Sequence, residues 1–237
     1  MSRLLAAYWR RTETVAAPPL RLWIESTNHC NLRCVMCPNR DTPAGAKGHM
    51  DFDLYRRIID QVGTFANDIY LHHRGEPLLQ PRLFDMIHYA RAAGLKVRFH
   101  TNGALLDTGK AAALLDAAPD LVSFSVDAFY KEGYEQIRVN GRFEQTVGNI
   151  LGLLDLRRQR GLTTPYIVIE KIRFAAGDPP DRRAEAAALR RRFLDHGADE
   201  VIEKAEYTWA TEDAAAPALP RRCSVCPFLW YAMVILQ

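Results

Sequence analysis

Short apolar runs and amphipathic stretches alternate along most of this chain. The first apolar run, residues 20–27, follows two prolines and contains a single charge after Arg21, a pattern typical of a buried β-strand. Similar runs recur at intervals that leave room for a helix between them. The pattern predicts further strands over residues 68–73, 96–101, 121–126, 165–174 and 200–206.

Between these runs, apolar residues recur at the three- and four-residue spacing of an amphipathic helix. Residues 51–64 have this spacing, and they predict a helix with one apolar face. Residues 80–93 contain Pro81 at their start and are followed by Gly94, the punctuation expected at the two ends of a helix. Further helices are predicted over residues 108–118, 130–138, 143–160 and 181–196.

Six strands that alternate with helices indicate an α/β protein with a parallel sheet and right-handed crossovers. Six units are two short of a closed eight-stranded barrel, so we expect an incomplete six-unit barrel, with an open doubly wound sheet as the alternative. In both architectures ligands bind at the carboxyl ends of the strands. We expect a lead-in over residues 1–19, the barrel over 20–207, a linker over 208–222 and a separate terminal segment over 223–237.

Composition excludes several classes of protein without changing this fold. The 237 residues are 48% hydrophobic and 25% charged, as in ordinary globular domains. The net charge of +3 is too small to indicate a nucleic-acid partner. No apolar run approaches the roughly 18 residues of a membrane span, and the apolar stretch of residues 4–7 is too short for the apolar region of a signal peptide. We therefore expect a cytoplasmic protein with neither nucleic acid nor membrane as a partner.

The five cysteines fall into two groups. Cys30, Cys34 and Cys37 follow the first strand, and Cys223 and Cys226 lie near the end of the sequence. In a reducing cytosol such clusters are more often metal or redox sites than disulfides. Structural zinc takes four protein ligands, and the common ferredoxin spacings also differ from this one. Three thiolates favour an iron–sulfur cluster with one open iron, and a zinc-stabilised binding module without redox chemistry is the alternative.

The segment Cys30-Asn-Leu-Arg-Cys34-Val-Met-Cys37-Pro resembles the signature loop of radical S-adenosylmethionine (radical SAM) enzymes. The resemblance implies that the three cysteines bind a 4Fe–4S cluster and that S-adenosylmethionine chelates its fourth iron. One electron, expected from a flavodoxin or ferredoxin-type donor, would then release a 5′-deoxyadenosyl radical that abstracts hydrogen from the substrate. The cofactor would carry this chemistry, and the protein would supply position, polarity and exclusion of water.

Two motifs after the second and third strands are similar to segments of that family that bind S-adenosylmethionine. Arg74-Gly75-Glu76-Pro77 resembles its Gly-Gly-Glu-Pro turn, with Arg74 in place of the first glycine. The resemblance implies that Gly75 and Glu76 meet the methionine amino group, for which a carboxylate is a suitable acceptor. Thr-Asn102-Gly resembles a further family motif that implies cofactor binding by Asn102, and an ordinary Asn-Gly turn is the alternative.

The fourth strand and the helix after it add three candidates. Ser123, Ser125 and Asp127 alternate along the strand, so they are expected to share one polar face. The resemblance implies that Ser125 and Asp127 bind the ribose, and Asp127 could instead cap the next helix. Arg138 resembles the family's arginine that pairs with the methionine carboxylate through a planar fork of donors, although it could also lie on a helix surface.

The remaining polar candidates concern the substrate. Glu170 and Lys171 interrupt the fifth strand and cannot both face solvent, so one of them is expected to point toward the cofactor or substrate. No residue can be assigned as hydrogen donor or general base. Five aromatic or imidazole side chains are candidates for lining a substrate pocket, with ordinary packing as the alternative: His72, His73, His100, Tyr207 and Trp209.

The terminal segment carries the second cysteine group. Cys223-Ser-Val-Cys226-Pro-Phe resembles the start of the SPASM or twitch extension, which houses auxiliary iron–sulfur clusters. A zinc half-site and a redox pair are the alternatives. The apolar stretch that follows would be the unpaired first strand of a hairpin, so we expect the sequence to be truncated within this extension. The resemblance implies a substrate in peptide or protein maturation, or a sugar-like small molecule.

Overall fold

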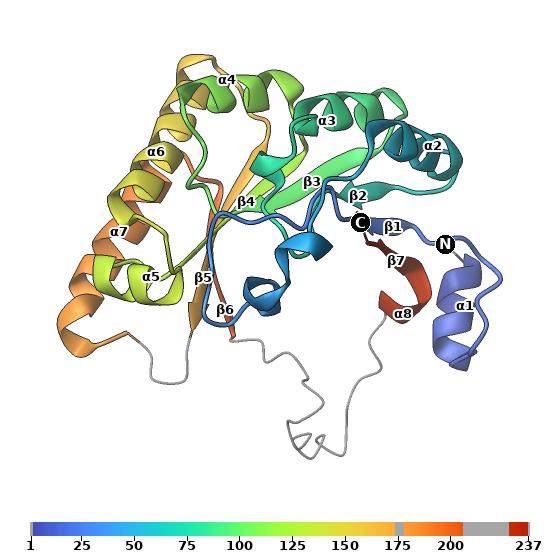
Figure 1. The fold of residues 1–237 in the computed structure, drawn as a ribbon, viewed down its shortest axis with the longest axis horizontal. Coiled ribbons are helices and arrows are strands. Elements are labelled where there is room, and N and C mark those ends of the chain that lie inside the picture. Colours follow the sequence, from blue (N-terminus) through green and yellow to red (C-terminus); the bar gives the residue numbers. More distant parts are fainter. Residues whose placement is uncertain (1, 174–177, 206–227, 237) are drawn as a thin grey trace.

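The computed structural model describes residues 2–173, 178–205 and 228–236 (Figure 1). Tyr207, Trp209, Cys223 and Cys226 lie outside these residues, so their expected roles stay predictions. Within the described part of the chain, no helix is long and apolar enough to cross a bilayer.

Seven parallel strands form one sheet in the order β6-β5-β4-β3-β2-β1-β7. Because β6 and β7 lie at opposite ends of this order, the sheet is open, and the expected α/β fold with an incomplete barrel is confirmed. The strands are β1 (Arg21–Ile24), β2 (Asp68–Tyr70), β3 (Lys96–Thr101), β4 (Leu121–Asp127), β5 (Tyr166–Arg173), β6 (Glu200–Ala205) and β7 (Ala232–Ile235).

Helices follow most of the strands, and the helices of residues 52–62, 83–92, 108–117, 143–159 and 183–195 lie in an arc along one side of the sheet (Figure 1). The side chains of Asp51 and Asp107 cap the helices that begin after them by accepting hydrogen bonds from backbone N–H groups of the first turn. The helices are α1 (Ser2–Arg10), α2 (Phe52–Val62), α3 (Leu83–Ala92), α4 (Thr108–Ala117), α5 (Lys131–Ile137), α6 (Phe143–Gln159), α7 (Arg183–Asp195) and α8 (Phe228–Tyr231).

The two faces of the sheet differ in polarity. Residues such as Ile24, Phe99 and Phe124 are fully buried and belong to the core that the sheet forms with the helices. Successive side chains of a strand point to opposite faces, so Trp23 and His100, next to these residues, face the other way and stay half-buried. The face that carries Trp23 and His100 is therefore the less buried of the two.

The two terminal segments of the described chain pack against each other. Residues 2–10 form α1, which packs beside α8 (Figure 1), with the Tyr8 ring edge-on to Trp230 at 5.5 Å. The terminal strand β7 pairs in parallel with β1, so the expectation that it stays unpaired is wrong. The physical reason is that β1 would otherwise end the sheet with a row of unpaired backbone groups, which this apolar strand covers.

Candidate active site

The three cysteines lie on the loop that leaves β1 at its carboxyl end. Buried Asn39 anchors this loop, because its amide nitrogen donates to the backbone oxygens of Asn28 at 2.9 Å and Arg74 at 3.1 Å. Arg74 itself is bound to the buried carboxylate of Glu25, through its backbone N–H at 3.1 Å and its Nε at 3.4 Å. The arginine that replaces the family's first glycine therefore joins the turn after β2 to β1.

Cys34 sits in the best-fixed part of the loop. The backbone N–H groups of Arg33 and Val35 donate to the carbonyl oxygens of Val139 and Ile137, each at 3.0 Å. These two bonds flank Cys34, and they hold it against the chain segment that follows α5. The loop is thus fixed by contacts with residues about one hundred positions away in the sequence.

A cavity of about 310 Å³ opens beside this loop. It brings together side chains from the ends of β2, β3 and β4 and from the end of α5. Of the residues singled out in the sequence, the cavity is lined by Cys30, Cys34, Cys37, Gly75, Glu76, Asn102, Ser125 and Arg138, and by His72, His73 and His100.

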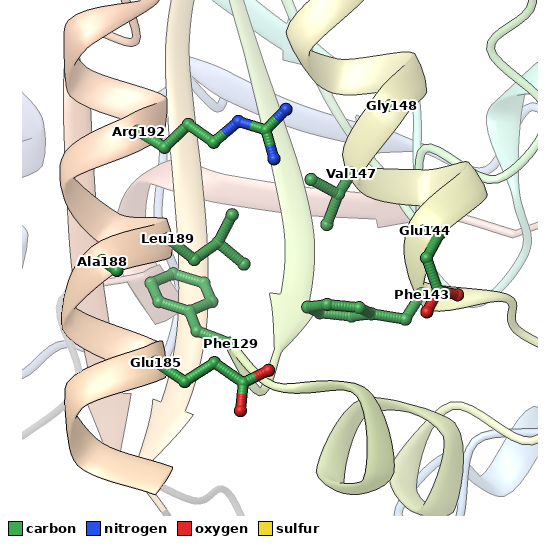
Figure 2. Close-up of a pocket in the computed structure, with 9 residues that line it drawn as sticks. All are labelled: Phe129, Phe143, Glu144, Val147, Gly148, Glu185, Ala188, Leu189 and Arg192. Atoms are coloured by element: carbon green, nitrogen blue, oxygen red, sulfur yellow. The ribbon is translucent and has the colours of Figure 1, made fainter.

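A larger cavity of about 480 Å³ lies elsewhere, between α6 and α7. Figure 2 shows Phe129 and Leu189 facing Phe143 and Val147 across it. Its walls are mainly apolar, and the charged residues Glu144, Glu185 and Arg192 also line it. It contains no cysteine and no other candidate from the sequence, so the smaller cavity is the candidate active site.

Gly75 is required by packing against the protein itself. A Cβ atom at this position would lie 2.0 Å from the carbonyl oxygen of Thr27. The next residue, Glu76, donates its backbone N–H to the carbonyl oxygen of His29 at 2.8 Å. The turn after β2 therefore lies directly on the backbone that leads into Cys30, whereas the sequence had suggested a close approach to a ligand.

The carboxylate of Glu76 is buried and joins two strand ends. Its Oε1 accepts from the Thr101 hydroxyl at 2.6 Å and from the Leu78 N–H at 3.0 Å, and its Oε2 accepts from the Asn102 N–H at 2.7 Å. Burial raises the pKa of Glu76, and these hydrogen bonds partly offset the effect. The Asn102 side chain donates in turn to Asn31 at 2.9 Å, which ties β3 to the cysteine loop.

On β4, Ser125 lines the cavity and Asp127 does not. The pairing with β5 slips between these two residues, and Asp127 adopts a left-handed backbone conformation with φ of 67°. Its carboxylate accepts a hydrogen bond from Arg138 Nε at 2.6 Å. Asp127 therefore contacts a residue of the cavity lining, Arg138, without being part of that lining, and it lies where strand pairing is irregular.

Two imidazoles stack below the cysteine loop. The rings of His72 and His100 lie 4.2 Å apart at an angle of 23°, and the His100 backbone N–H donates to His72 Nδ1 at 3.1 Å. This bond requires an unprotonated Nδ1 on His72. Burial lowers the pKa of both side chains, so both are neutral near pH 7.

The two charged residues of β5 turn in opposite directions. Glu170 lies on the side of the cavity, with Oε2 at 3.6 Å from His100 Nδ1 and Oε1 accepting from Lys204 Nζ at 2.6 Å. Lys171 forms an ion pair with Asp178. Of the two, Glu170 is the one that lies close to a residue of the cavity lining, His100. Sequence reasoning missed its partner Lys204 as well as Asn39, which no motif marks, and it assigned no role to Thr101 of the Thr-Asn-Gly motif.

The donor set of the cysteine loop consists of three thiols, the ligand type of iron–sulfur clusters. Among the described residues, no three His, Cys, Asp or Glu side chains converge where one metal ion could bind. Each ligand atom of a zinc ion lies about 2.0–2.3 Å from that one ion. The cysteines of a cluster bind separate irons, so their sulfur atoms can lie further from one another. Burial raises the pKa of Cys30 to about 11 and also raises that of Cys34, where the charge of Arg138 acts in the opposite direction.

A family model and curated relatives match this chain in sequence. The Radical SAM superfamily model matches residues 24–170. The AdoMet-dependent heme synthase of Methanosarcina barkeri is 35% identical over 135 residues, which are 56% of this chain and 38% of that protein. The PqqA peptide cyclase of Gluconobacter oxydans is 27% identical over 210 residues, which are 88% of this chain and 56% of that protein.

A solved structure extends the likeness to the fold. Streptococcus suis SuiB bound to S-adenosylmethionine superimposes with a TM-score of 0.64 at 14% identity, over 87% of this chain and 44% of that one. At this identity the likeness concerns the fold alone. The chain spans between 38% and 56% of the length of the two curated relatives described above.

Proposed function

Because the chain belongs to the radical SAM superfamily, whose members use a 4Fe–4S cluster and S-adenosylmethionine, we propose that Cys30, Cys34 and Cys37 hold such a cluster here. The observation that carries this proposal is the single cavity in which all three thiols meet the candidate ligands of S-adenosylmethionine. When bound, the cluster supplies one electron to S-adenosylmethionine, which gives methionine and a 5′-deoxyadenosyl radical for hydrogen abstraction.

The chain's own residues bind and orient the cofactor in this proposal. Gly75 and Glu76 meet the methionine amino group, Ser125 meets the ribose, and Arg138 meets the methionine carboxylate. Asn102 borders the site, where its backbone N–H is bonded to Glu76. Support comes from the common lining of these five residues around one cavity, although they are far apart in the sequence.

For the substrate, we propose peptide or protein maturation. Support comes from the PqqA peptide cyclase, because the match to this relative covers 88% of the chain. A sugar-like small molecule is the second candidate within the same chemistry. The electron donor in either case is proposed to be a flavodoxin or a ferredoxin-type protein.

Alanine variants of the three cysteines test the proposed cluster. We expect Cys30→Ala, Cys34→Ala and Cys37→Ala each to abolish release of 5′-deoxyadenosine from S-adenosylmethionine in dithionite-reduced, anaerobically reconstituted protein. The double variant Cys223→Ser/Cys226→Ser is the matched control, because two thiols cannot complete a cluster that needs four ligands. It should keep the iron content and the cleavage. Normal 5′-deoxyadenosine release by any of the three single variants would refute the assignment.

The zinc-stabilised binding module is the rival function. It predicts a colourless protein with about one zinc and no acid-labile sulfide, whereas the cluster predicts about four irons and a brown chromophore. Metal and sulfide analysis of anaerobically purified protein distinguishes the two.

A further inference from the structure

We propose that Asp127 positions Arg138 for the methionine carboxylate and does not bind the ribose of S-adenosylmethionine. This inference rests on the proposed function, since it concerns the same cofactor site. It changes the role of the residue that ends β4, which the sequence had assigned to the ribose together with Ser125.

The end of β4 is irregular at Asp127, just beyond the position of Ser125. The pairing of β4 with β5 slips between these two residues, and Asp127 has a φ of 67°. Non-glycine residues hold this conformation only where the surroundings fix it, and Asp and Asn tolerate it better than other residues. The residue is 2% exposed, and its side chain is not among those that line the cavity.

The partner of this buried carboxylate is Arg138. Nε and one terminal nitrogen of the guanidinium each lie 2.6 Å from Asp127 Oδ2. Arg138 lines the cavity with Ser125 and the cysteines, so its guanidinium joins the buried carboxylate to the cofactor site. Asp127 thus acts on this site through the arginine.

The backbone around Arg138 is fixed as well. The carbonyl oxygens of Ile137 and Val139 accept from the N–H groups of Val35 and Arg33, each at 3.0 Å. The arginine is held at its main chain by the cysteine loop and at its head group by Asp127. A long, flexible side chain is therefore oriented before any ligand arrives, which reduces the entropy lost when it binds a carboxylate.

A guanidinium has five N–H donors in a rigid fork, and Asp127 occupies only one edge of it. The remaining donors can receive an anionic group in the cavity. A ribose offers hydroxyl groups and no negative charge, so it has no corresponding use for this cation. The geometry of the pair thus matches the amino acid end of S-adenosylmethionine.

Two ligands separate the two roles of Asp127. S-adenosylmethionine carries both ribose and carboxylate, whereas 5′-methylthioadenosine carries the same ribose without the amino acid end. In equilibrium binding to the anaerobically reconstituted chain, Asp127→Asn should lower the affinity for S-adenosylmethionine roughly tenfold, because a charge-assisted hydrogen bond is lost. Binding of 5′-methylthioadenosine should stay within about twofold of the wild type, because no ribose contact is removed. Asn suits the left-handed backbone at this position, so the fold is expected to remain.

Arg138→Lys and Ser125→Ala complete the experiment. Arg138→Lys should reproduce the selective loss, because lysine keeps the charge and lacks the fork. Ser125→Ala is the matched control for the ribose contact, and it should lower the affinity for both S-adenosylmethionine and 5′-methylthioadenosine. If Asp127→Asn retains too little iron to be measured, Asp127→Asn/Arg138→Gln removes both charges of the pair and should show the same selectivity.

The outcomes are distinct. Equal weakening of both ligands by Asp127→Asn, or unchanged binding of S-adenosylmethionine, would overturn the positioning role. A wild-type protein that holds its cluster and binds neither ligand would instead contradict the proposed function. Selective loss of S-adenosylmethionine binding in Asp127→Asn, with unchanged iron content, supports the role assigned to Asp127.

Discussion

Replacing Gly75 by alanine perturbs the contact on which the site depends. A Cβ atom there would lie 2.0 Å from the Thr27 carbonyl oxygen, 2.7 Å from its carbonyl carbon and 2.8 Å from the Asn28 Cα, whereas ordinary contact begins at 3.4 Å. All three atoms belong to the backbone, so no side-chain rotation can relieve the overlap. The turn after β2 must separate from the segment that leads into the cysteine loop.

The cost follows from this geometry. Inserting a methyl group into a packed region costs about 1–3 kcal/mol when neighbours can adjust. Here the neighbours are the backbone at the end of β1, so we expect Gly75→Ala to lower the free energy of unfolding by about 3 kcal/mol. Because the displaced segment precedes Cys30 directly, the variant should also retain less iron after reconstitution.

Urea unfolding followed by circular dichroism measures the first effect, and iron analysis measures the second. Gly152→Ala is the matched control, because an added Cβ at this exposed position of α6 meets no atom within 4 Å. That variant should gain about 0.5–1 kcal/mol, because alanine favours helix more than glycine does. If Gly75→Ala unfolded within about 0.5 kcal/mol of the wild type and kept its iron, the packing argument would be wrong.

Two further predictions concern buried polar groups. Arg157→Ala should lower the free energy of unfolding, measured in urea, by about 3 kcal/mol, because the buried guanidinium donates to Asp199 at 2.6 Å and to backbone oxygens. Arg158→Ala removes an exposed ion pair and should lower it by less than about 1 kcal/mol. Burial holds the pKa of His72 below its usual 6.5, so the unfolded chain binds the proton more readily. The free energy of unfolding should therefore fall as the pH drops below 6.5, and that of His72→Gln should fall less steeply over the same range. Equal losses in both arginine variants, or parallel pH profiles, would contradict these arguments.

Local patterns were sufficient to predict most of the barrel and the cysteine loop. Apolar runs such as the one containing Ile24 mark buried strands, and the close spacing of Cys30, Cys34 and Cys37 indicates a shared ligand role. The pairing of β7 with β1 could not be predicted, since it joins residues more than two hundred positions apart and depends on which strand edge is left free.

Within the site, Ser125 lines the cavity, and Asp127 at the end of the same strand does not. The strand pairing is irregular between these two residues, and the amino acids themselves do not show where such a bulge occurs. The contact between Gly75 and Thr27 was hidden for a related reason. The glycine was visible in the sequence, but the backbone that it touches belongs to the segment after β1, which is distant in the sequence.

The most direct test of the central claim is the electron paramagnetic resonance spectrum of the dithionite-reduced, anaerobically reconstituted chain, recorded before and after addition of S-adenosylmethionine. If three cysteines hold a 4Fe–4S cluster with one iron free for this ligand, the reduced protein has a cluster signal, and S-adenosylmethionine changes it. Cys34→Ala should lose that response. A signal that S-adenosylmethionine leaves unchanged, or a protein with one zinc and no cluster signal, would contradict the account.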